Sequence, residues 1–287
     1  MHITLAAGRF VRMLLSALLL SLAVLAHAAD APTGIRLYVI DCGRIDASDM
    51  SLFDDSGALD GKPGTMSVPC FLIRHPKGIL LWETGLGDAI ADHPNGIDFA
   101  PGIHGSVRIR LVDQLKALGL KPSDIDYLAF SHWHIDHTGN ANLFGNATWI
   151  LQRRELAAAT GLAPPPFESL APVSAYKNAK MRLIDGDADV FGDGSVRLLS
   201  LPGHTPGHQA LQLQLPHAGV VLLSGDLYHS REARRLRRVP RVNVDRAATL
   251  ASMNRFEAIA TRTHAKVVVQ HDPRDIALLP HFPAYLH

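Results

Sequence analysis

Cysteine is scarce in this chain of 287 residues, and so is any excess of charge of one sign. The two cysteines are too few for a metal site built from thiolates. The 28 Lys and Arg residues nearly balance 27 Asp and Glu residues, so the formal net charge is +1. Nucleic-acid binding proteins usually carry a polybasic tail or a positive charge over the whole domain, and this chain has neither. We therefore expect no cysteine-held metal and no nucleic-acid partner.

A hydrophobic run long enough to cross a membrane is also missing. The apolar run at 13–25 falls short of the roughly 20 residues that a spanning helix needs. Arg9 and Arg12 precede this run and Ala26-His27-Ala28 follow it, an order typical of a cleaved secretory signal peptide. We expect residues 1–28 to be removed and the mature chain to be periplasmic or secreted without a stable membrane anchor. A retained anchor is the alternative.

The mature chain, residues 29–287, is long enough for one large domain or two small ones with a substantial core. Removal of residues 1–28 deletes two arginines and no acid, so 26 basic residues face 27 acidic ones and the net charge becomes −1. Cys42 and Cys70 lie in or beside apolar runs. Export would permit a disulfide between them, but two buried free thiols fit the sequence equally well.

Short apolar runs between turn residues predict many strands, and helical spacing of apolar residues predicts fewer helices. The predicted strands are 35–41, 68–73, 79–83, 124–130, 148–152, 196–201, 210–215, 220–223 and 266–270. The predicted helices are 107–118, 155–159 and 245–262, and the predicted loops are 43–67, 86–105 and 162–180. Strands interleaved with helices indicate mixed sheets covered by helices, an α/β class.

Histidine, by contrast, is abundant, and residues 130–139 read Phe-Ser-His-Trp-His-Ile-Asp-His-Thr-Gly. His132 and His134 are two residues apart, so in an extended segment they point the same way and can hold one metal ion. Asp136 and His137 follow after a turn and can face a second ion. Imidazole and carboxylate ligands suit zinc, and they can also hold iron, manganese or cobalt.

Three further candidate ligands each follow an apolar strand-like run: His204, Asp226 and His271. Strand ends at one edge of a sheet can converge on a single cleft. We therefore expect one site with two metal ions, and the ligand types favour Zn²⁺. The predicted metal ligands are His132, His134, Asp136, His137, His204, Asp226 and His271.

With this pattern His132-x-His134-x-Asp136-His137, followed by the three later ligands, the chain resembles the metallo-β-lactamase superfamily. The resemblance implies a four-layer α/β/β/α sandwich with the metals at one edge of the sheets. It assigns ligands to the two ions as follows: His132, His134 and His204 to one, Asp136, His137 and His271 to the other, and Asp226 between them. An aspartate at 226 argues against an antibiotic-degrading β-lactamase, and a histidine at 134 argues against a diiron redox protein.

Within that superfamily the chain is most similar to the N-acyl homoserine lactonases, through nearly the whole mature sequence. The similar segments are Asp41-Cys42-Gly43, 68–72, Glu83-Thr84-Gly85, 201–209 and 282–286. Glu83 stands where the superfamily usually has Asp, and Trp133 is bulkier than usual. The resemblance implies a zinc-dependent hydrolase that opens the lactone ring of these quorum signals.

Two cations that share one water lower its pKa and supply a hydroxide for attack on the lactone carbonyl. Asp226 is then expected to pass a proton to the departing alkoxide, with Asp136 as a second catalytic carboxylate. The family's substrate-contacting tyrosine lies a few residues past the bridging aspartate, and the candidate here is Tyr228. Its hydroxyl could donate to the carbonyl oxygen, or the residue could simply pack at a strand end.

Several other features have two interpretations. His208 is expected to orient a ligand rather than bind metal, and His93, His104 and His229 are candidates for the pocket lining. The arginine-rich run 231–238 is either an ion-paired surface or a mouth that attracts anions. The loops 44–67 and 86–105 are candidates for an acyl-chain groove.

Other functions remain open from the sequence. An exported phosphotriesterase or arylesterase, or a thiolester hydrolase of the glyoxalase type, would use the same ligand set. A non-catalytic metal-binding protein is a further alternative. In each enzyme reading the partner is a small ester-like substrate, and a homodimer is expected by analogy alone.

Overall fold

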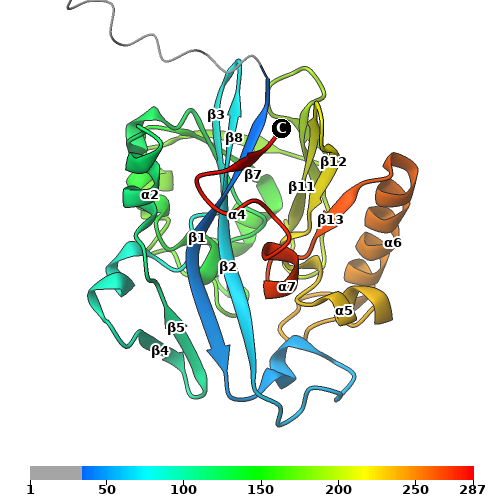
Figure 1. Ribbon diagram of the computed structural model, residues 1–287. Coiled ribbons are helices and arrows are strands. Elements are labelled where there is room, and N and C mark those ends of the chain that lie inside the picture. Colours follow the sequence, from blue (N-terminus) through cyan, green and yellow to red (C-terminus); the bar gives the residue numbers. More distant parts are fainter. Residues whose placement is uncertain (1–33) are drawn as a thin grey trace, which may run out of the picture. The chain divides into compact units, whose positions relative to one another are not determined.

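Two β-sheets pack face to face in the computed structural model, which describes residues 34–287 (Figure 1). The predicted signal peptide lies outside these residues. The first sheet has nine strands in the order β4-β5-β1-β2-β3-β6-β7-β8, with β14 paired to β1. Its strands are β1 (Arg36–Ala47), β2 (Gly64–His75), β3 (Gly78–Trp82), β4 (Ile97–Ala100), β5 (Ile103–Ser106), β6 (Tyr127–Ala129), β7 (Thr148–Gln152), β8 (Lys180–Ile184) and β14 (Tyr285–Leu286).

The second sheet has five strands in the order β13-β12-β11-β10-β9. They are β9 (Ala188–Asp189), β10 (Val196–Ser200), β11 (Gln209–Leu215), β12 (Gly219–Leu223) and β13 (Lys266–Val268). The α-helices are α2 (Leu111–Ala117), α3 (Ile135–Thr138), α4 (Arg153–Ala159), α5 (Arg231–Leu236), α6 (Arg246–Thr263) and α7 (Pro273–Ile276). The 3₁₀ helices are η1 (Met50–Phe53), η2 (Asp88–Asp92), η3 (Pro122–Asp124), η4 (Ala141–Phe144), η5 (Ser174–Lys177) and η6 (Gly225–Leu227).

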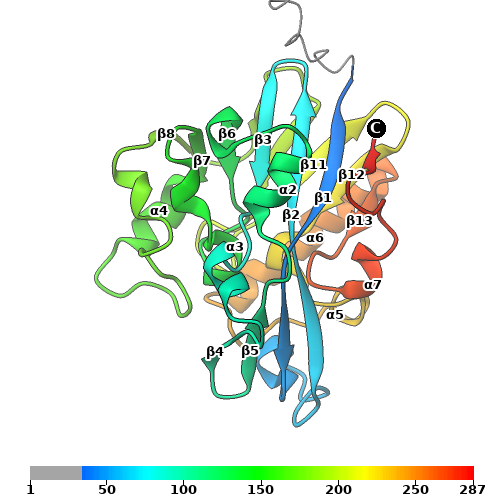
Figure 2. The same ribbon diagram turned by 60° about the vertical axis from the view of Figure 1, so that its left-hand side comes forward.

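The hydrophobic core is divided by the sheets into layers. On β3, Leu80 and Trp82 point into the core between the two sheets, whereas Leu81 points to the opposite face, where α2 packs. This alternation is the two-residue period of a strand buried on both faces. On the far side of the second sheet, Met253 and Phe256 of α6 form another core. The order helix, sheet, sheet, helix confirms the predicted four-layer sandwich (Figures 1 and 2).

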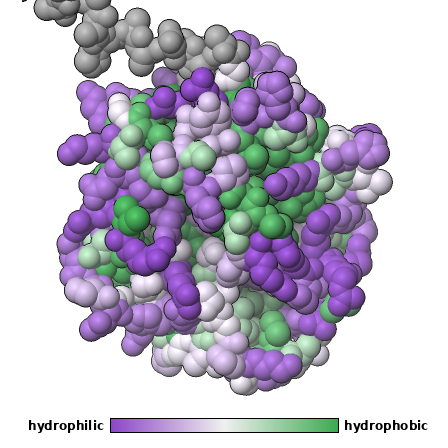
Figure 3. Space-filling view, in the orientation of Figure 1, coloured by the Kyte–Doolittle hydropathy of each residue, from purple (hydrophilic) through white to green (hydrophobic). Residues whose placement is uncertain are grey.

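Polar side chains predominate over the face shown in Figure 3, and hydrophobic ones gather there in smaller patches. Within residues 34–287 no helix has the length and apolar character needed to cross a membrane.

The strands that carry the predicted ligands end at the same edge of the sandwich. β6 runs parallel to its neighbours β3 and β7, and β12 runs parallel to β13. Parallel strands present their carboxyl ends together, so the loops after β6, β12 and β13 leave from one side. The loop after β10 joins them, because Gln209 N–H at the start of β11 donates to Ser131 O in the loop after β6 (2.9 Å).

Two of the three predicted loops contain strands, and the third contains the 3₁₀ helix η5. The predicted strand at 35–41 continues to Ala47 past an irregularity between Asp41 and Arg44, and β2 already begins at Gly64. In this extension Ile45 and Ala47 are buried while Arg44 is exposed, so the polar residues that suggested a loop form the outer face of a strand. Likewise the predicted loop 86–105 contains the hairpin β4–β5, which pairs with β1.

A disulfide joins Cys42 to Cys70, which settles the alternative that the sequence left open. The two cysteines lie on the neighbouring antiparallel strands β1 and β2, and both are buried. The predicted helix 107–118 is shorter than expected and begins at Leu111, because Asp88 accepts hydrogen bonds from the Leu111 and Val112 N–H groups at its start.

Candidate metal centre

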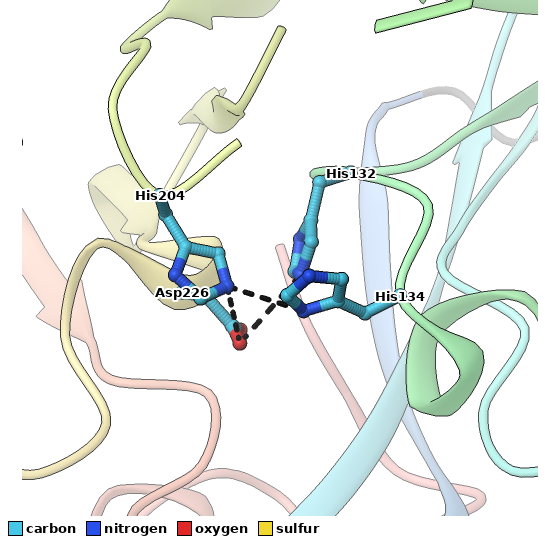
Figure 4. Close-up of side chains that lie close together, drawn as sticks. All are labelled: His132, His134, His204 and Asp226. Carbon is cyan, nitrogen blue, oxygen red and sulfur yellow. Dashed lines mark hydrogen bonds and ion pairs between the residues drawn. The ribbon is translucent and has the colours of Figure 1, made fainter. Parts of the chain in front are cut away.

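The histidine-rich segment after β6 forms one side of the candidate site. β6 ends at Ala129, and the chain continues past a bend at Ser131 to the extended His134, which precedes α3. His132 and His134 therefore turn their rings toward the same space, as the two-residue spacing predicted, and meet His204 and Asp226 there (Figure 4). His134 Nδ1 lies 3.3 Å from His204 Nε2. We call these three histidines the first ligand set.

The second ligand set consists of Asp136, His137 and His271. Asp136 Oδ2 lies 3.7 Å from His137 Nε2 and 3.6 Å from His271 Nε2. One atom from each of the three residues lies within 4.8 Å of the others, as does one atom from each member of the first set together with Asp226. Spacings of this size leave room for an ion in the middle of each set.

The carboxylate of Asp226 lies between the two sets. Its Oδ2 faces the first set, 3.4 Å from His204 Nε2 and 3.7 Å from His132 Nε2. Its Oδ1 faces the second set, 2.9 Å from His271 Nε2 and 3.1 Å from His137 Nε2. One oxygen toward each set is the arrangement that a bridging ligand needs. The seven residues together, here called the metal cage, are the seven predicted ligands, and the structure brings them all to one place.

The residues of the cage fit a pair of divalent cations. His132 Nε2, His137 Nε2, His271 Nε2 and Asp226 Oδ1 are buried, and they have no hydrogen-bond partner outside the cage. Buried polar atoms normally have a hydrogen-bond partner. Four ligand atoms that converge on one space without an outside partner therefore indicate a place where cations bind. The opposite ring nitrogens are occupied, since His132 Nδ1 contacts Ser131 Oγ at 2.9 Å and His271 Nδ1 contacts Ser67 O at 2.8 Å. Such outer contacts fix the direction of a metal-binding ring.

The charge state of the cage also suits cations. Burial, reinforced by neighbouring imidazoles, lowers the pKa of His132 and of His134 well below the usual value, which favours the neutral form that binds metal. For His137 burial acts in the same direction, but the carboxylates of Asp226 and Asp136 outweigh it and raise the pKa. The pKa of His271 is raised in the same way, since Asp226 and Asp136 again outweigh its burial. A site that favours the charged form of two imidazoles has an excess of negative charge for a cation to neutralise.

His208 supports the cage without facing either ligand set. Its Nδ1 donates to Leu201 O at 2.9 Å, and its Nε2 accepts a hydrogen bond from the Asp226 N–H at 3.0 Å. Burial, followed by the nearby His204, lowers the pKa of His208 to about 3, so the ring is neutral. This is the orienting role predicted for it. Gly225 has a φ of 53°, and a Cβ there would lie 2.6 Å from Ser131 Cβ, so glycine is needed to bring Asp226 this close.

Two buried glutamates hold the ligand loops. Glu83 lies 3.3 Å from His137 Nδ1 and accepts the Ser131 N–H, so the longer acid found in place of the family's aspartate still reaches the cage. Glu155 accepts hydrogen bonds from the Trp133 N–H (3.0 Å), the Thr205 hydroxyl (2.8 Å) and the Gly207 N–H (2.7 Å). It thereby ties the loop after β6 to the loop after β10. This role of Glu155 has no signal in the sequence, because nothing at the start of a short helix marks a buried cross-link.

Tyr228 does not lie where its predicted substrate contact requires. Its hydroxyl donates to Glu257 Oε1 at 3.0 Å, and its ring packs against Phe256 in the core beneath α6. It is not among the residues that line the cavity over the cage. The turn η6 is the reason: it directs Asp226 and His229, three residues apart, to the cavity and Tyr228 into the core. His229 takes the cavity position instead, with Nε2 3.1 Å from Asp226 Oδ2.

A small cavity opens above the cage. Its floor includes cage residues, and its walls are mostly apolar. The walls come from both predicted acyl-groove loops, from the segment after α4 and from the segment between α5 and α6. They include Leu52, Phe53, Phe99, Ile103, Phe167 and Val242. Of the other candidate pocket histidines, His104 is instead paired with Asp98, and neither it nor His93 lines the cavity.

The arginine-rich run 231–238 is largely ion-paired. Arg231 pairs with Asp275, Arg234 with Glu257, and Arg238 with the buried Asp54. The structure thus supports the ion-paired interpretation for these three arginines. The Asp54 pair matters for the cavity, because Asp54 belongs to the segment 48–63 that carries Leu52 and Phe53. We call residues 48–63 the wall segment.

Residues 63–271 match the family model described as the metallo-beta-lactamase superfamily. The chain belongs to this superfamily. It shares 32% identity over 253 residues with the N-acyl homoserine lactonase AttM of Azorhizobium caulinodans, which covers 84% of this chain and 94% of AttM. It shares 30% identity over 257 residues with the N-acyl homoserine lactonase AiiA of Bacillus thuringiensis subsp. kurstaki, which covers 88% of this chain and 98% of AiiA.

Among solved structures, an N-acyl homoserine lactone hydrolase with the product N-hexanoyl-L-homoserine bound at its catalytic metal centre superposes with a TM-score of 0.77. It is 28% identical, and the match covers 88% of this chain and all of that one. The predicted membership of the metallo-beta-lactamase superfamily is therefore confirmed, as is the likeness to its lactonase branch. The cage is a dinuclear metal site of this superfamily.

Proposed function

We propose that this chain is a metal-dependent hydrolase that opens the lactone ring of N-acyl homoserine lactones. The observation that carries the proposal is the position of Asp226, with one carboxylate oxygen toward each ligand set, at the floor of a cavity with apolar walls. The polar floor suits a lactone ring and the walls suit an acyl chain. The activity named for AttM and AiiA supports the same substrate.

Bound in the cage, two divalent cations would supply Lewis acidity and a water of lowered pKa. The chain's own groups supply the rest. Hydrolysis breaks the ring C–O bond and adds water, so one proton must travel from the attacking water to the departing alkoxide oxygen. The Asp226 carboxylate lies between the two ligand sets and is positioned to carry that proton. Asp136 lies beside it on the cavity floor and holds the His137 and His271 side of the site.

We further propose zinc as the native metal. Five imidazoles and two carboxylates are ligands that zinc accepts readily, and iron, manganese and cobalt are the competitors. Metal analysis of protein purified without added metal should find two zinc ions per chain. A dominant content of another metal would replace this assignment without touching the lactonase proposal.

Export to the periplasm or beyond is the third part of the proposal. The Cys42–Cys70 disulfide supports it, because such bonds persist mainly outside the reducing cytoplasm. N-terminal sequencing of protein recovered from the periplasm should give a chain that begins at Ala29. Recovery of the full-length chain from the membrane fraction would instead favour an anchor.

The lactonase activity can be tested by pH-stat titration, since ring opening releases a proton. Metal-loaded protein should hydrolyse acyl homoserine lactones, chelation should abolish the activity, and added Zn²⁺ should restore it. An aryl phosphotriester serves as the comparison substrate. Turnover of the phosphotriester without turnover of any lactone would refute the proposed substrate, and activity that survives complete chelation would refute the metal mechanism.

A further inference from the structure

The Cys42–Cys70 disulfide lies where the hydrogen bonding between β1 and β2 is disturbed. The register of the two strands is regular up to Asp41 and resumes at Arg44, so two residues of β1 stand opposite one residue of β2. Pro69, which pairs with Asp41, has no N–H to donate to the neighbouring strand. The covalent bond therefore joins the strands at the place where their ladder of hydrogen bonds is disrupted.

On the β1 side, the disulfide is the surface against which the loop after β3 rests. Gly85 of this loop lies so close that an added Cβ would be 2.3 Å from Cys42 Cβ and 2.6 Å from Cys42 O. The next residue, Leu86, donates its N–H to Cys42 O at 3.2 Å. The position of residues 83–86 therefore depends directly on the position of Cys42.

The same loop holds His137 of the second ligand set. Thr84 donates twice to His137 O, from its N–H at 2.7 Å and from its hydroxyl at 3.1 Å. Gly85 O accepts the Gly139 N–H at 2.7 Å, and Glu83 Oε1 lies 3.3 Å from His137 Nδ1. These contacts fix both the backbone and the ring of His137 relative to residues 83–86.

On the β2 side, the disulfide is close to the support of His271, another member of the second ligand set. Ser67 precedes Cys70 by three residues on β2. Its N–H donates to His271 O at 3.1 Å, and its carbonyl oxygen lies 2.8 Å from His271 Nδ1. The disulfide thus joins the strand that holds His271 to the residue that backs the loop holding His137.

The first ligand set is supported by other contacts. Glu155 joins the loop after β6, which carries His132 and His134, to the loop after β10, which carries His204. The contacts that start from the disulfide end at two members of the second set instead. The two sets are therefore held in place by different parts of the fold.

We infer that the Cys42–Cys70 disulfide is a positioning element for the second ligand set, because it fixes the supports of His137 and His271 relative to each other. Ligands whose directions are set before binding lose less freedom when an ion binds. Loss of the disulfide should therefore weaken the binding of one ion and leave the other bound. The inference concerns metal binding and does not rest on the lactone substrate.

The first test compares Cys42→Ala/Cys70→Ala with the unaltered chain, with Zn²⁺ as the probe. Competition with a chelator should show that one of the two ions binds about 10- to 100-fold more weakly, while the affinity for the other is unchanged. Anomalous X-ray scattering from zinc in crystals of the variant should show the loss at the second ligand set. In the metal-free protein, hydrogen exchange should become faster at Thr84, Leu86 and Gly139, whose N–H groups make the contacts described above.

Removal of a disulfide also destabilises the whole fold, so a control must share that loss. Leu213→Ala provides it, because Leu213 is fully buried in the core between the sheets and pairs with Val221 on β12. It should lower the melting temperature without distinguishing between the two ions. If Leu213→Ala weakened the same ion selectively, general instability would explain the effect and the inference would be overturned.

A second variant keeps the disulfide and moves the loop. Gly85→Ala places a Cβ against Cys42, so residues 83–86 must shift, and we expect the same selective loss of the second ion. Gly192→Ala is the matched control: its φ of 75° is close to the 70° of Gly85, but no atom lies within 4 Å of the added Cβ. Both ions should bind normally in Gly192→Ala. The inference is overturned if either Gly85→Ala or the folded double variant binds both ions as tightly as the unaltered chain, or if both ions are weakened equally.

Discussion

The floor and the walls of the cavity differ in how they are held in place. On the floor, six of the seven cage residues are buried, and their outer contacts run to buried groups such as Glu83, Ser131 and His208. The walls come from surface segments, where Phe167 is 44% exposed and the wall segment is attached by ion pairs. We infer that the floor determines the chemistry and that the walls, which can change at little cost to the fold, determine which ester enters.

The largest effect should follow from a change at the centre of the floor. Asp226→Asn removes the negative charge between the two ligand sets and the group proposed to carry the proton. We expect kcat to fall by about 10³-fold for every ester tested, whatever its acyl chain. Metal content should be measured on the same sample. A variant that keeps both ions and full turnover would show that the carboxylate carries no proton.

Glu155→Gln should have the next largest effect, although Glu155 contacts no metal set directly. Burial raises the pKa of Glu155, and its hydrogen bonds from Thr205, Trp133 and Gly207 oppose that shift. An amide cannot accept all three bonds, and each buried donor left unpaired costs about 1–3 kcal/mol of the free energy of unfolding.

We therefore expect a lower melting temperature for Glu155→Gln and a roughly 10- to 100-fold weaker metal affinity, as for other residues that support ligands. Excess metal should restore much of the activity, which would separate this positioning role from that of Asp226. If metal affinity and melting temperature both stayed unchanged, the two ligand loops would not depend on Glu155.

The floor could be predicted from the sequence because its evidence is local. The spacing of His132, His134, Asp136 and His137 reflects an extended segment followed by a turn, and the later ligands each follow a strand. The four-layer sandwich could be anticipated from the resemblance that those residues carry. Each of these signals depends on a few neighbouring residues in the chain.

The parts of the fold and of the site that the sequence did not predict depend on contacts between distant segments. Glu155 lies 50 residues from Thr205, and the bond between them has no counterpart in sequence spacing. The resemblance favours Tyr228 because the family has a tyrosine a few residues past the bridging aspartate, but which of Tyr228 and His229 faces the cavity is decided by the turn η6 and by Glu257 on α6. The hairpin β4–β5 was missed because its four-residue strands are too short for a hydrophobic period to show.

A change in the wall should alter substrate choice rather than chemistry. Phe53→Ala shortens a side chain that lines the cavity and lies against His229. A long acyl chain that packs against this aromatic ring loses apolar contact when the ring is removed. KM should therefore rise about tenfold for a long-chain lactone and much less for a short-chain one. The measurement is kcat and KM across lactones with four to twelve acyl carbons. Leu143→Ala, at an exposed position outside the cavity, is the control. An equal loss for all chain lengths would mean that Phe53 acts on the floor.

The smallest effect should come from the attachment of the wall segment. Arg238→Gln breaks the 2.8 Å pair with Asp54, a residue that is only 2% exposed. We expect faster hydrogen exchange in residues 49–57, a KM raised a few-fold for long-chain lactones and an unchanged kcat. The exposed pair Arg153–Asp185 supplies the control Arg153→Gln, which should change none of these quantities.

Acid should loosen the same attachment. Burial alone would raise the pKa of Asp54, but hydrogen bonds from Ser56 and Arg238 outweigh it and lower the pKa below the usual 3.8. Because the pKa is lower in the folded state, the stabilisation by Asp54 is present above pH 3.8 and is lost as the pH falls through the lowered value. In Arg238→Gln the Asp54 pKa should move upward, so loosening should begin at a higher pH than in the unaltered chain. If hydrogen exchange in the wall segment became faster at the same pH in both proteins, this ion pair would not be what holds the segment. Its backbone hydrogen bonds, such as Asp55 N–H to Val239 O, would hold it instead.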